Sequence, residues 1–519
     1  MRASQKTNHD KEDLLREMVL LAAIATCFFF IGYANLCNFC EYMESDIGAE
    51  VEMAGLLSSN HFLQPSTWVH STHGYMITTS NLAAVFYSIN GNLNLSMGLS
   101  CTVFTILFSG MGYLFYRKIH FSRVAALLGV LLPLVLTTNI VVFYKTVALY
   151  AGYYSCYILI LFLVLFFYAD IIQNNRVAPW IWIVSLILAV ITGIQSMHAV
   201  IFIWLPVFAT EFIRLVRNLI GQYIFKKKGS FLKIHISSML WSFSTLAICL
   251  ILNKCATSYG SDTSRNFRNS MAKLWGEIIP EVAGLFSIDI SFLIVTIIMI
   301  VSVIGIFFLV KSEDTRWSTI PVLFSFAVPV FGATFTTMDS AGRYYIMIIF
   351  IIAMGFSFFY DMINRNMMQS NAIKNIMIIF AIVLTIISMR SFYCKTCAES
   401  DYQSSDEYQA VNWIMENGYT KGYTTWEYAA NMTVLSNNNV LIASVADMKD
   451  MCGCKWLTDT SWYPPVAQVE NETVYIVPDE CLSDFDIFVN EKNPKIIQQS
   501  KFGNLSIFVT NKDYSFWEG

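Results

Sequence analysis

Five carboxylates stand close together after the first apolar stretch of the chain: Glu41, Glu44, Asp46, Glu50 and Glu52. The sequence contains no Lys or Arg between Glu17 and Tyr116, so no basic residue nearby in the chain neutralises them. A carboxylate can take a proton from a hydroxyl as a general base, and several carboxylates can bind a divalent cation. Negative charge gathered beside an apolar stretch therefore predicts a functional region. The alternative is a solvated loop that merely carries acids, because exposed carboxylates are common.

The residues around these carboxylates predict a short helix. Asp46 and Glu50 lie four positions apart and would share one of its faces. The membrane interface is expected to hold the apolar residues Ile47, Val51, Ala54 and Leu57. A second interfacial helix is expected over Asn81–Ile89, which is apolar but too short to cross a bilayer.

Arg343 has the chemistry to bind a phosphate. It stands in Gly-Arg-Tyr, after a short polar turn and at the start of an otherwise apolar stretch. A guanidinium at that place is suited to bidentate contact with a phosphate. The alternative is an interface anchor, in which Tyr344 and Tyr345 form part of an aromatic belt.

Lys145 is a second candidate for phosphate binding, at the end of another apolar stretch and shortly before Tyr150, Tyr153 and Tyr154. Its ammonium group could hold a lipid phosphate or simply extend to water. Met197-His198 lies between two short apolar stretches, where a turn with a capped histidine is the favoured interpretation.

The composition shows what surrounds these residues. Of the 519 residues, 55% are hydrophobic and only 13% are charged, and the mean hydropathy is +0.53. These values exclude an ordinary soluble protein and indicate a polytopic membrane protein. The net charge of −4 provides no general basic surface for a nucleic acid.

About eleven apolar stretches approach the roughly 20 residues that a membrane-spanning helix needs. They are Met18–Asn38, Leu95–Tyr116, Val124–Phe143, Val147–Tyr168, Ile181–Gln195, Val200–Ile213, Ser237–Leu252, Ser291–Val310, Ile320–Phe335, Tyr344–Phe359 and Ile376–Met389. Lys and Arg are concentrated on alternate connections, as the positive-inside rule expects of the cytoplasmic side. This pattern predicts a cytoplasmic N-terminus, with the first long loop, Cys40–Asn94 (the acidic loop), and everything after Arg390 on the outer side.

The composition changes after Arg390, which predicts a membrane module over residues 1–390 and a small external α/β domain over residues 391–519. In the second part Glu407–Asn417 has helical spacing. Strands are expected over Val440–Val445, Thr473–Val477 and Leu505–Thr510. In an oxidising exterior, five cysteines of this part favour disulfides over a zinc site: Cys394, Cys397, Cys452, Cys454 and Cys481.

The acidic loop resembles a known family. Ser45-Asp46-x-x-x-Glu50, then Pro65-x-x-Trp68-x-x-Ser71-Thr72, then an apolar helix, is similar to the first external loop of GT-C integral-membrane glycosyltransferases. These include the polyprenyl-phosphate-sugar-dependent enzymes related to protein mannosyltransferases and bacterial aminoarabinose transferases. The layout of the chain is also similar to that of this family: a cytoplasmic start, an acidic outer loop, about eleven spans and an external domain. Gly-Arg-Tyr at Arg343 resembles the Arg-Tyr often found in the same superfamily.

The resemblance implies a function and roles for particular residues. The enzyme would move a sugar from a polyprenyl-phosphate donor to a lipid, glycan or protein acceptor at the outer face of the membrane. Asp46 would be the catalytic base, with Glu50 and Glu52 as supporting residues or, together with Asp46, as ligands of an optional divalent cation. Trp68 and His73 would support the site, and Arg343 and Lys145 would bind the donor phosphate. His73 stands where many related bacterial sequences carry an acidic residue.

Two other functions compete with transfer of a sugar. A polytopic transporter would place ionisable residues inside its spans, and apart from residues near their ends these spans contain almost none. A non-catalytic envelope assembly protein would tolerate the loss of Asp46.

Overall fold

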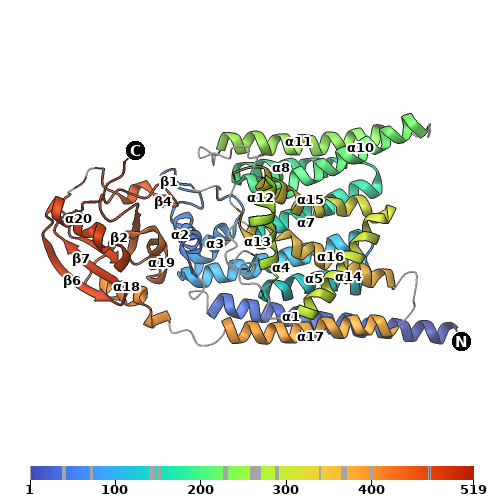
Figure 1. Ribbon diagram of the computed structural model, residues 1–519, viewed down its shortest axis with the longest axis horizontal. Coiled ribbons are helices and arrows are strands. Elements are labelled where there is room, and N and C mark those ends of the chain that lie inside the picture. The colour runs from blue at the N-terminus through green and yellow to red at the C-terminus, as the bar shows by residue number, and fades with distance from the viewer. Residues whose placement is uncertain are drawn as a thin grey trace. The chain divides into compact units, whose positions relative to one another are not determined.

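The protein was analysed as a computed structural model (Figure 1), which describes residues 2–37, 43–70, 74–139, 147–148, 154–225, 232–256, 270–286, 292–337, 340–363, 371–396, 402–465, 467 and 469–518. The chain divides into two compact units. The membrane unit comprises Met1–Ile31 and Thr102–Thr396, and the sheet unit comprises Gly32–Cys101 and Cys397–Gly519. The acidic loop thus groups with the C-terminal residues, a division that differs from the one expected at residue 390.

Long apolar helices make up the membrane unit and its connections to the sheet unit. They are α1 (Arg2–Cys37), α4 (Leu93–Lys118), α5 (Arg123–Asn139), α7 (Tyr154–Asn174), α8 (Pro179–Gln195), α10 (Leu205–Phe225), α11 (Leu232–Ala256), α14 (Phe292–Lys311), α15 (Glu313–Phe335), α16 (Met347–Met362) and α17 (Asn371–Thr396). In the described part of the chain, nine helical segments are long and apolar enough to cross a membrane, and Arg123–Thr138 and Pro179–Gln195 are shorter apolar helices. These segments follow the eleven predicted spans in order, which confirms a multi-pass helical membrane fold.

Helices form here because a chain in hydrocarbon must satisfy its backbone hydrogen bonds within itself. Glycine then lets two such helices approach closely. Where α14 meets α16, a Cβ on Gly305 would lie 3.1 Å from the Cα of Gly355 and would overlap its carbonyl group. At the predicted cytoplasmic side, Arg16 on α1 donates to Asn375 on α17 over 3.0 Å. These two helices run side by side in Figure 1.

Short helical segments connect several of these spans. They are α9 (Met197–Ala199), η3 (Val200–Trp204), α12 (Ser270–Lys273), η4 (Leu274–Ile278), α13 (Ile279–Gly284) and η5 (Gly342–Tyr345). Ser196 Oγ accepts a hydrogen bond from the backbone N–H of His198 and so caps α9. This is the capped turn that the sequence predicts.

The sheet unit contains a five-stranded sheet in the order β3-β2-β5-β7-β6. Its strands are β2 (Lys421–Thr425), β3 (Leu441–Val445), β5 (Thr473–Pro478), β6 (Ile496–Phe502) and β7 (Leu505–Thr510). Strand β2 runs parallel to β3 and β5, whereas β7 runs antiparallel to β5 and β6. The predicted strands correspond to β3, β5 and β7, so the α/β character of this region is confirmed. Strands β2 and β6 were not predicted, because β2 is short and contains a glycine and β6 carries polar residues along an exposed edge.

Three helices cover this sheet: α18 (Asp406–Glu416), α19 (Trp426–Leu435) and α20 (Leu482–Lys492). Alternation along β5 sends Val474 and Ile476 into the core with α18 and α19. Tyr475 and Val477 point to the opposite core, which α20 helps to fill. This alternation is the normal consequence of the two-residue period of a strand.

The acidic loop is built into the same unit through α2 (Ser45–Ser59), β1 (Trp68–Val69) and α3 (Thr79–Asn90). Strand β1 pairs antiparallel with β4 (Thr458–Asp459), and α2 packs on both α3 and α19. A Cβ on Gly48 would lie 2.9 Å from the backbone nitrogen of Asn431, so only a glycine permits this approach to α19. The expected interfacial helix over Asn81–Ile89 corresponds to α3.

The expectation that four residues of α2 lie on the membrane interface is wrong. Ile47, Val51, Ala54 and Leu57 are at most 1% exposed. The reason is that α2 has protein neighbours on more than one side, so its apolar residues fill a core.

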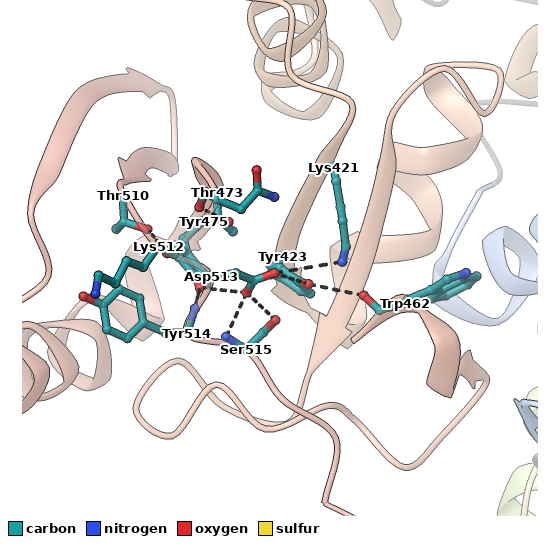
Figure 2. A network of polar contacts seen from close by, with 11 residues as sticks. Lys421, Tyr423, Trp462, Thr473, Tyr475, Thr510, Lys512, Asp513, Tyr514 and Ser515 are labelled. Carbon is teal, nitrogen blue, oxygen red and sulfur yellow. Dashed lines mark hydrogen bonds and ion pairs between the residues drawn. The ribbon is translucent and has the colours of Figure 1, made fainter. Parts of the chain in front are cut away.

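The C-terminal end of the sheet unit is fixed by Asp513, whose surroundings Figure 2 shows. Its carboxylate accepts hydrogen bonds from the Tyr423 hydroxyl over 2.9 Å and from the Ser515 backbone N–H over 2.9 Å. Lys421 Nζ, at the start of β2, lies 4.0 Å from the same carboxylate. This network ties the segment after β7 to the inner strands β2 and β5.

The disulfide prediction is wrong for the described cysteines of this region. Cys394, Cys452, Cys454 and Cys481 are free thiols, and Cys397 lies outside the described residues. The segment Cys452–Cys454 is held by bridges of Cys452 to Phe516 and of Gly453 to Val445, so backbone pairing rather than a cross-link fixes it. Burial raises the pKa of the Cys454 thiol and favours its protonated form.

Candidate functional site

The predicted site residues lie in both units. Asp46, Glu50, Glu52 and Trp68 belong to the sheet unit, and Arg343 belongs to the membrane unit. His73 and Lys145 lie outside the described residues.

Asp46 lies in the first turn of α2 and is partly exposed. The helix begins after Glu44, whose carbonyl accepts the Gly48 N–H over 2.7 Å. Ser45 Oγ donates to the Glu427 carbonyl over 3.2 Å and so attaches this turn to the start of α19. A carboxylate in the first turn is stabilised by the helix dipole. The Asp46 side chain is partly accessible from outside the protein.

Glu50 shares the Asp46 face of α2, as the four-residue spacing predicts, but it is only 6% exposed. Its Oε1 accepts from the Tyr75 hydroxyl over 3.1 Å. Its Oε2 accepts from Ser80 Oγ, in the first turn of α3, over 2.7 Å. Two hydroxyl donors thus compensate the burial of this carboxylate, which links α2 to the segment around α3.

Glu52 lies on the other side of α2 and is 3% exposed. Burial raises the pKa of its carboxyl group from 4.5 to about 8, the Thr433 hydroxyl lowers it in part, and the charge of Asp459 raises it further. Among the described residues, Glu52 Oε1 has no hydrogen-bond partner. Burial between α2 and the C-terminal residues therefore favours the protonated, uncharged form of Glu52.

Trp68 is buried at the point where the acidic loop pairs with the C-terminal residues. Its neighbour across the strand pair is Asp459, and its ring meets that of Trp462 edge to face at 5.9 Å between centroids. An edge-to-face aromatic pair adds stability beyond the area it buries. Trp68 thus anchors the middle of the acidic loop to the C-terminal residues.

The three carboxylates of α2 do not form the common cation site that the sequence suggested. Within the described part of the chain, no three or more His, Cys, Asp or Glu side chains come together in a group that could hold a metal ion. The cause is helix geometry, because positions 50 and 52 are about 200° apart around a helix of 3.6 residues per turn. Glu50 accordingly turns toward Tyr75 and Ser80, and Glu52 toward Thr433 and Asp459.

Arg343 lies in η5, a single turn that precedes the apolar helix α16, as predicted. The Gly342 N–H donates to Glu281 Oε1 over 2.8 Å. Ser340 Oγ and the Tyr345 hydroxyl are 2.9 Å apart. The Arg343 guanidinium is half-buried and lies over the Tyr344 ring, 5.8 Å from its centroid. These contacts on either side of Arg343 fix the turn that carries it.

Sequence reasoning missed the partners of these residues. Thr78 and Asn81 form a capping box at the start of α3, a pattern that could have placed Ser80 in a first helical turn. No comparable signal connects Tyr75 with Glu50. The contact of Glu281 with Gly342 joins residues 61 positions apart, and no local pattern predicts it.

Glu52→Gln tests the protonated state of Glu52. The pKa of Glu52 is raised in the folded protein, so the folded state binds the proton more tightly than the unfolded state does. The stability that this proton contributes is complete below about pH 4.5 and is lost as the pH rises through about 8. We expect Glu52→Gln to flatten the pH dependence of the thermal unfolding midpoint in this window. At pH 8 and above, the unfolding midpoint of Glu52→Gln should be higher than that of the unsubstituted protein.

The matched control is Glu44→Gln, an exposed glutamate beside the same helix. It removes one carboxylate without changing a buried group, so its unfolding midpoints should follow the native pH dependence. If the unfolding midpoints of Glu52→Gln and of the unsubstituted protein changed with pH in the same way, Glu52 would be ionised in the folded state.

Comparison with known proteins shows a likeness of fold. No protein-family model matches the chain, and no curated protein matches it. The chain is similar to the crystal structure of ArnT from Cupriavidus metallidurans bound to undecaprenyl phosphate, with a TM-score of 0.55 and 9% sequence identity. The likeness covers 95% of this chain and 97% of that one. The chain therefore shares the overall fold of ArnT over nearly its whole length.

Proposed function

We propose that this protein is a membrane glycosyltransferase that moves a sugar from a polyprenyl-phosphate donor to an acceptor at the outer face of the membrane. The observation that carries the proposal is the likeness of fold over nearly the whole chain to ArnT, whose structure holds undecaprenyl phosphate. The partly exposed Asp46 and the anchored Arg343 supply two groups that such a reaction needs. The acceptor is a hydroxyl-bearing lipid, glycan or protein.

In this reaction Asp46 is the general base. Its carboxylate takes the proton of the acceptor hydroxyl while the oxygen attacks the anomeric carbon of the sugar. The bond between that carbon and the phosphate oxygen breaks, and the electron pair leaves with the phosphate. A phosphate is a good leaving group, so the step requires a base for the acceptor more than a strong acid for the donor.

Arg343 binds the donor phosphate and stabilises the charge that grows on it as the bond breaks. Its half-buried guanidinium suits this role, because a charge-assisted hydrogen bond gains strength where water is partly excluded. Lys145 is proposed as a second cation for the same phosphate. Glu50 supports Asp46 by joining α2 to Tyr75 and Ser80, and Trp68 and Glu52 hold the loop that bears them. His73 is proposed as a further supporting residue of the site.

One observation bears on the alternative of a transporter. Glu211 lies inside the span Met197–Gly221 and is fully buried, whereas the sequence suggested that the spans contain almost no ionisable residues away from their ends. Its carboxylate accepts from Tyr168 over 2.6 Å, from Ser238 over 2.6 Å and from Arg214 over 3.0 Å. A carboxylate with three donors is well compensated, which favours a structural pair over a transport site.

The proposal requires the sheet unit on the outer side, with the N-terminus in the cytoplasm. In a background depleted of native cysteines, Glu491→Cys places a thiol on the exposed end of α20. We expect this thiol to react with a membrane-impermeant reagent on intact cells. Asn174→Cys, exposed at the end of α7, is the control and should react only after lysis. The reverse pattern would invert the orientation.

Asp46→Asn tests the base. The amide keeps the size and polarity of the side chain but cannot accept the proton, so turnover should fall by roughly 10²–10⁴-fold with undecaprenyl phosphate binding intact. Asp450→Asn, the same change at an exposed site of the sheet unit, should leave turnover unchanged. Transfer at nearly the native rate by a well-folded Asp46→Asn protein would remove Asp46 from the reaction.

Arg343→Lys tests the phosphate contact. Lysine keeps the charge but loses the planar fork, so binding of undecaprenyl phosphate should weaken by about 1–3 kcal/mol, and Arg343→Ala should weaken it further. Arg316→Lys is the control, because Arg316 donates to the carbonyls of Val310 and Lys311 beside another helix. Titration of purified protein with undecaprenyl phosphate gives the dissociation constants. An unchanged constant for Arg343→Ala would contradict the assignment.

A further inference from the structure

His198 lies in the short turn between α8 and η3, and both of its ring nitrogens are engaged. Nδ1 is 2.8 Å from Ser196 Oγ, and Nε2 is 3.2 Å from the Tyr154 hydroxyl. The uncharged ring satisfies both contacts when Tyr154 donates to Nε2 and Nδ1–H donates to Ser196, a proton placement assigned from the network. Two contacts on opposite sides of an imidazole fix its rotation.

Aromatic rings hold the same imidazole from its faces. The rings of Tyr157 and Phe202 each lie 6.0 Å from it between centroids, with interplanar angles of 19° and 11°. The Tyr154 ring meets it edge to face at 5.4 Å. Tyr154 and Tyr157 come from α7 and Phe202 from η3, and all three are buried. His198 is therefore a rigid part of the membrane unit rather than a mobile side chain.

This fixed histidine reaches the Arg343 turn through Tyr344. The Tyr344 ring lies 6.1 Å from the His198 ring, with an interplanar angle of 32°. The Arg343 guanidinium in turn lies 5.8 Å from the centroid of the Tyr344 ring. Tyr344 is thus contacted both by the rigid histidine and by the guanidinium. The order of contacts from α7 to the arginine is Tyr154, His198, Tyr344 and Arg343.

The contact with Tyr344 adds to the hydrogen bonds of the turn. A four-residue 3₁₀ turn has few hydrogen bonds of its own, and η5 is held by Glu281 at the Gly342 backbone and by Ser340 at the Tyr345 hydroxyl. The advantage of a guanidinium over an ammonium is its directed fork, which is lost when the side chain swings. A misplacement of about 1 Å can cost roughly 10²-fold in a well-aligned site.

We infer that His198 is a positioning residue: it fixes the Tyr344 ring and, through it, the orientation in which Arg343 receives the donor phosphate. This inference rests on the proposed function, because it assigns His198 to the same phosphate site. His198 acts through Tyr344 and makes no contact of its own with the donor. Its contribution therefore exists only while Arg343 is present.

Titration with undecaprenyl phosphate tests this dependence. His198→Ala should raise the dissociation constant roughly 10- to 100-fold. His198→Phe keeps a flat ring between Tyr157, Phe202 and Tyr344 but loses both hydrogen bonds, so it should weaken binding less than His198→Ala does. The control His120→Ala removes an exposed histidine that contacts Gln173 and should change nothing. The thermal unfolding midpoint of each variant shows whether the variant is folded. If His198→Ala does not fold, the His198→Phe protein still tests the inference.

The decisive measurement is a double-mutant cycle. In an Arg343→Ala background, His198→Ala should cause no further loss of binding. An equal loss in both backgrounds, or a His198→Phe protein as weak as His198→Ala, would overturn the positioning role while leaving Arg343 in place. If Arg343→Ala alone binds undecaprenyl phosphate normally, the phosphate assignment of the proposed function fails, and the role of His198 fails with it.

Discussion

The sheet unit depends on how two carboxyl groups are buried on one helix. Glu50 and Glu52 lie two positions apart on α2, in a part of the sequence that has no Lys or Arg between Glu17 and Tyr116. A buried carboxyl group must be hydrogen-bonded or must take up a proton. Glu50 accepts hydrogen bonds from Tyr75 and Ser80. Glu52 instead favours a bound proton, because burial raises its pKa to about 8. Each solution fixes one side of α2 against a different neighbour.

These contacts make the acidic loop part of the C-terminal fold. Gly48 allows α2 to lie directly on α19, and the pairing of β1 with β4 brings Trp68 against Trp462. Asp46 is therefore held by residues that lie far away in the sequence. A change in α19 that moved α2 would move Asp46 as well.

In the membrane unit, charged and polar side chains that lie among apolar helices also need hydrogen-bond or ion-pair partners. Glu211 is buried with three donors around it, and Arg343 lies in a turn held at Gly342, Tyr344 and Tyr345. The polar side chains of this unit are thus placed by specific partners, since hydrocarbon offers them no water. The Arg343 turn accordingly has both a hydrogen-bonded and an aromatic neighbour, Glu281 at Gly342 and His198 at Tyr344.

The sequence by itself determined the helical membrane fold, because each span must contain a long apolar stretch whose helix satisfies its own backbone. It also determined that Asp46 and Glu50 share a face and that Arg343 precedes an apolar helix, since both follow from local spacing. Tertiary structure alone decided that Glu52 faces Thr433, that Ile47, Val51, Ala54 and Leu57 are covered by protein, and that His198 meets Tyr344. These contacts join residues that no local period connects, and their energies come from burial and packing, which exist only once the chain has folded.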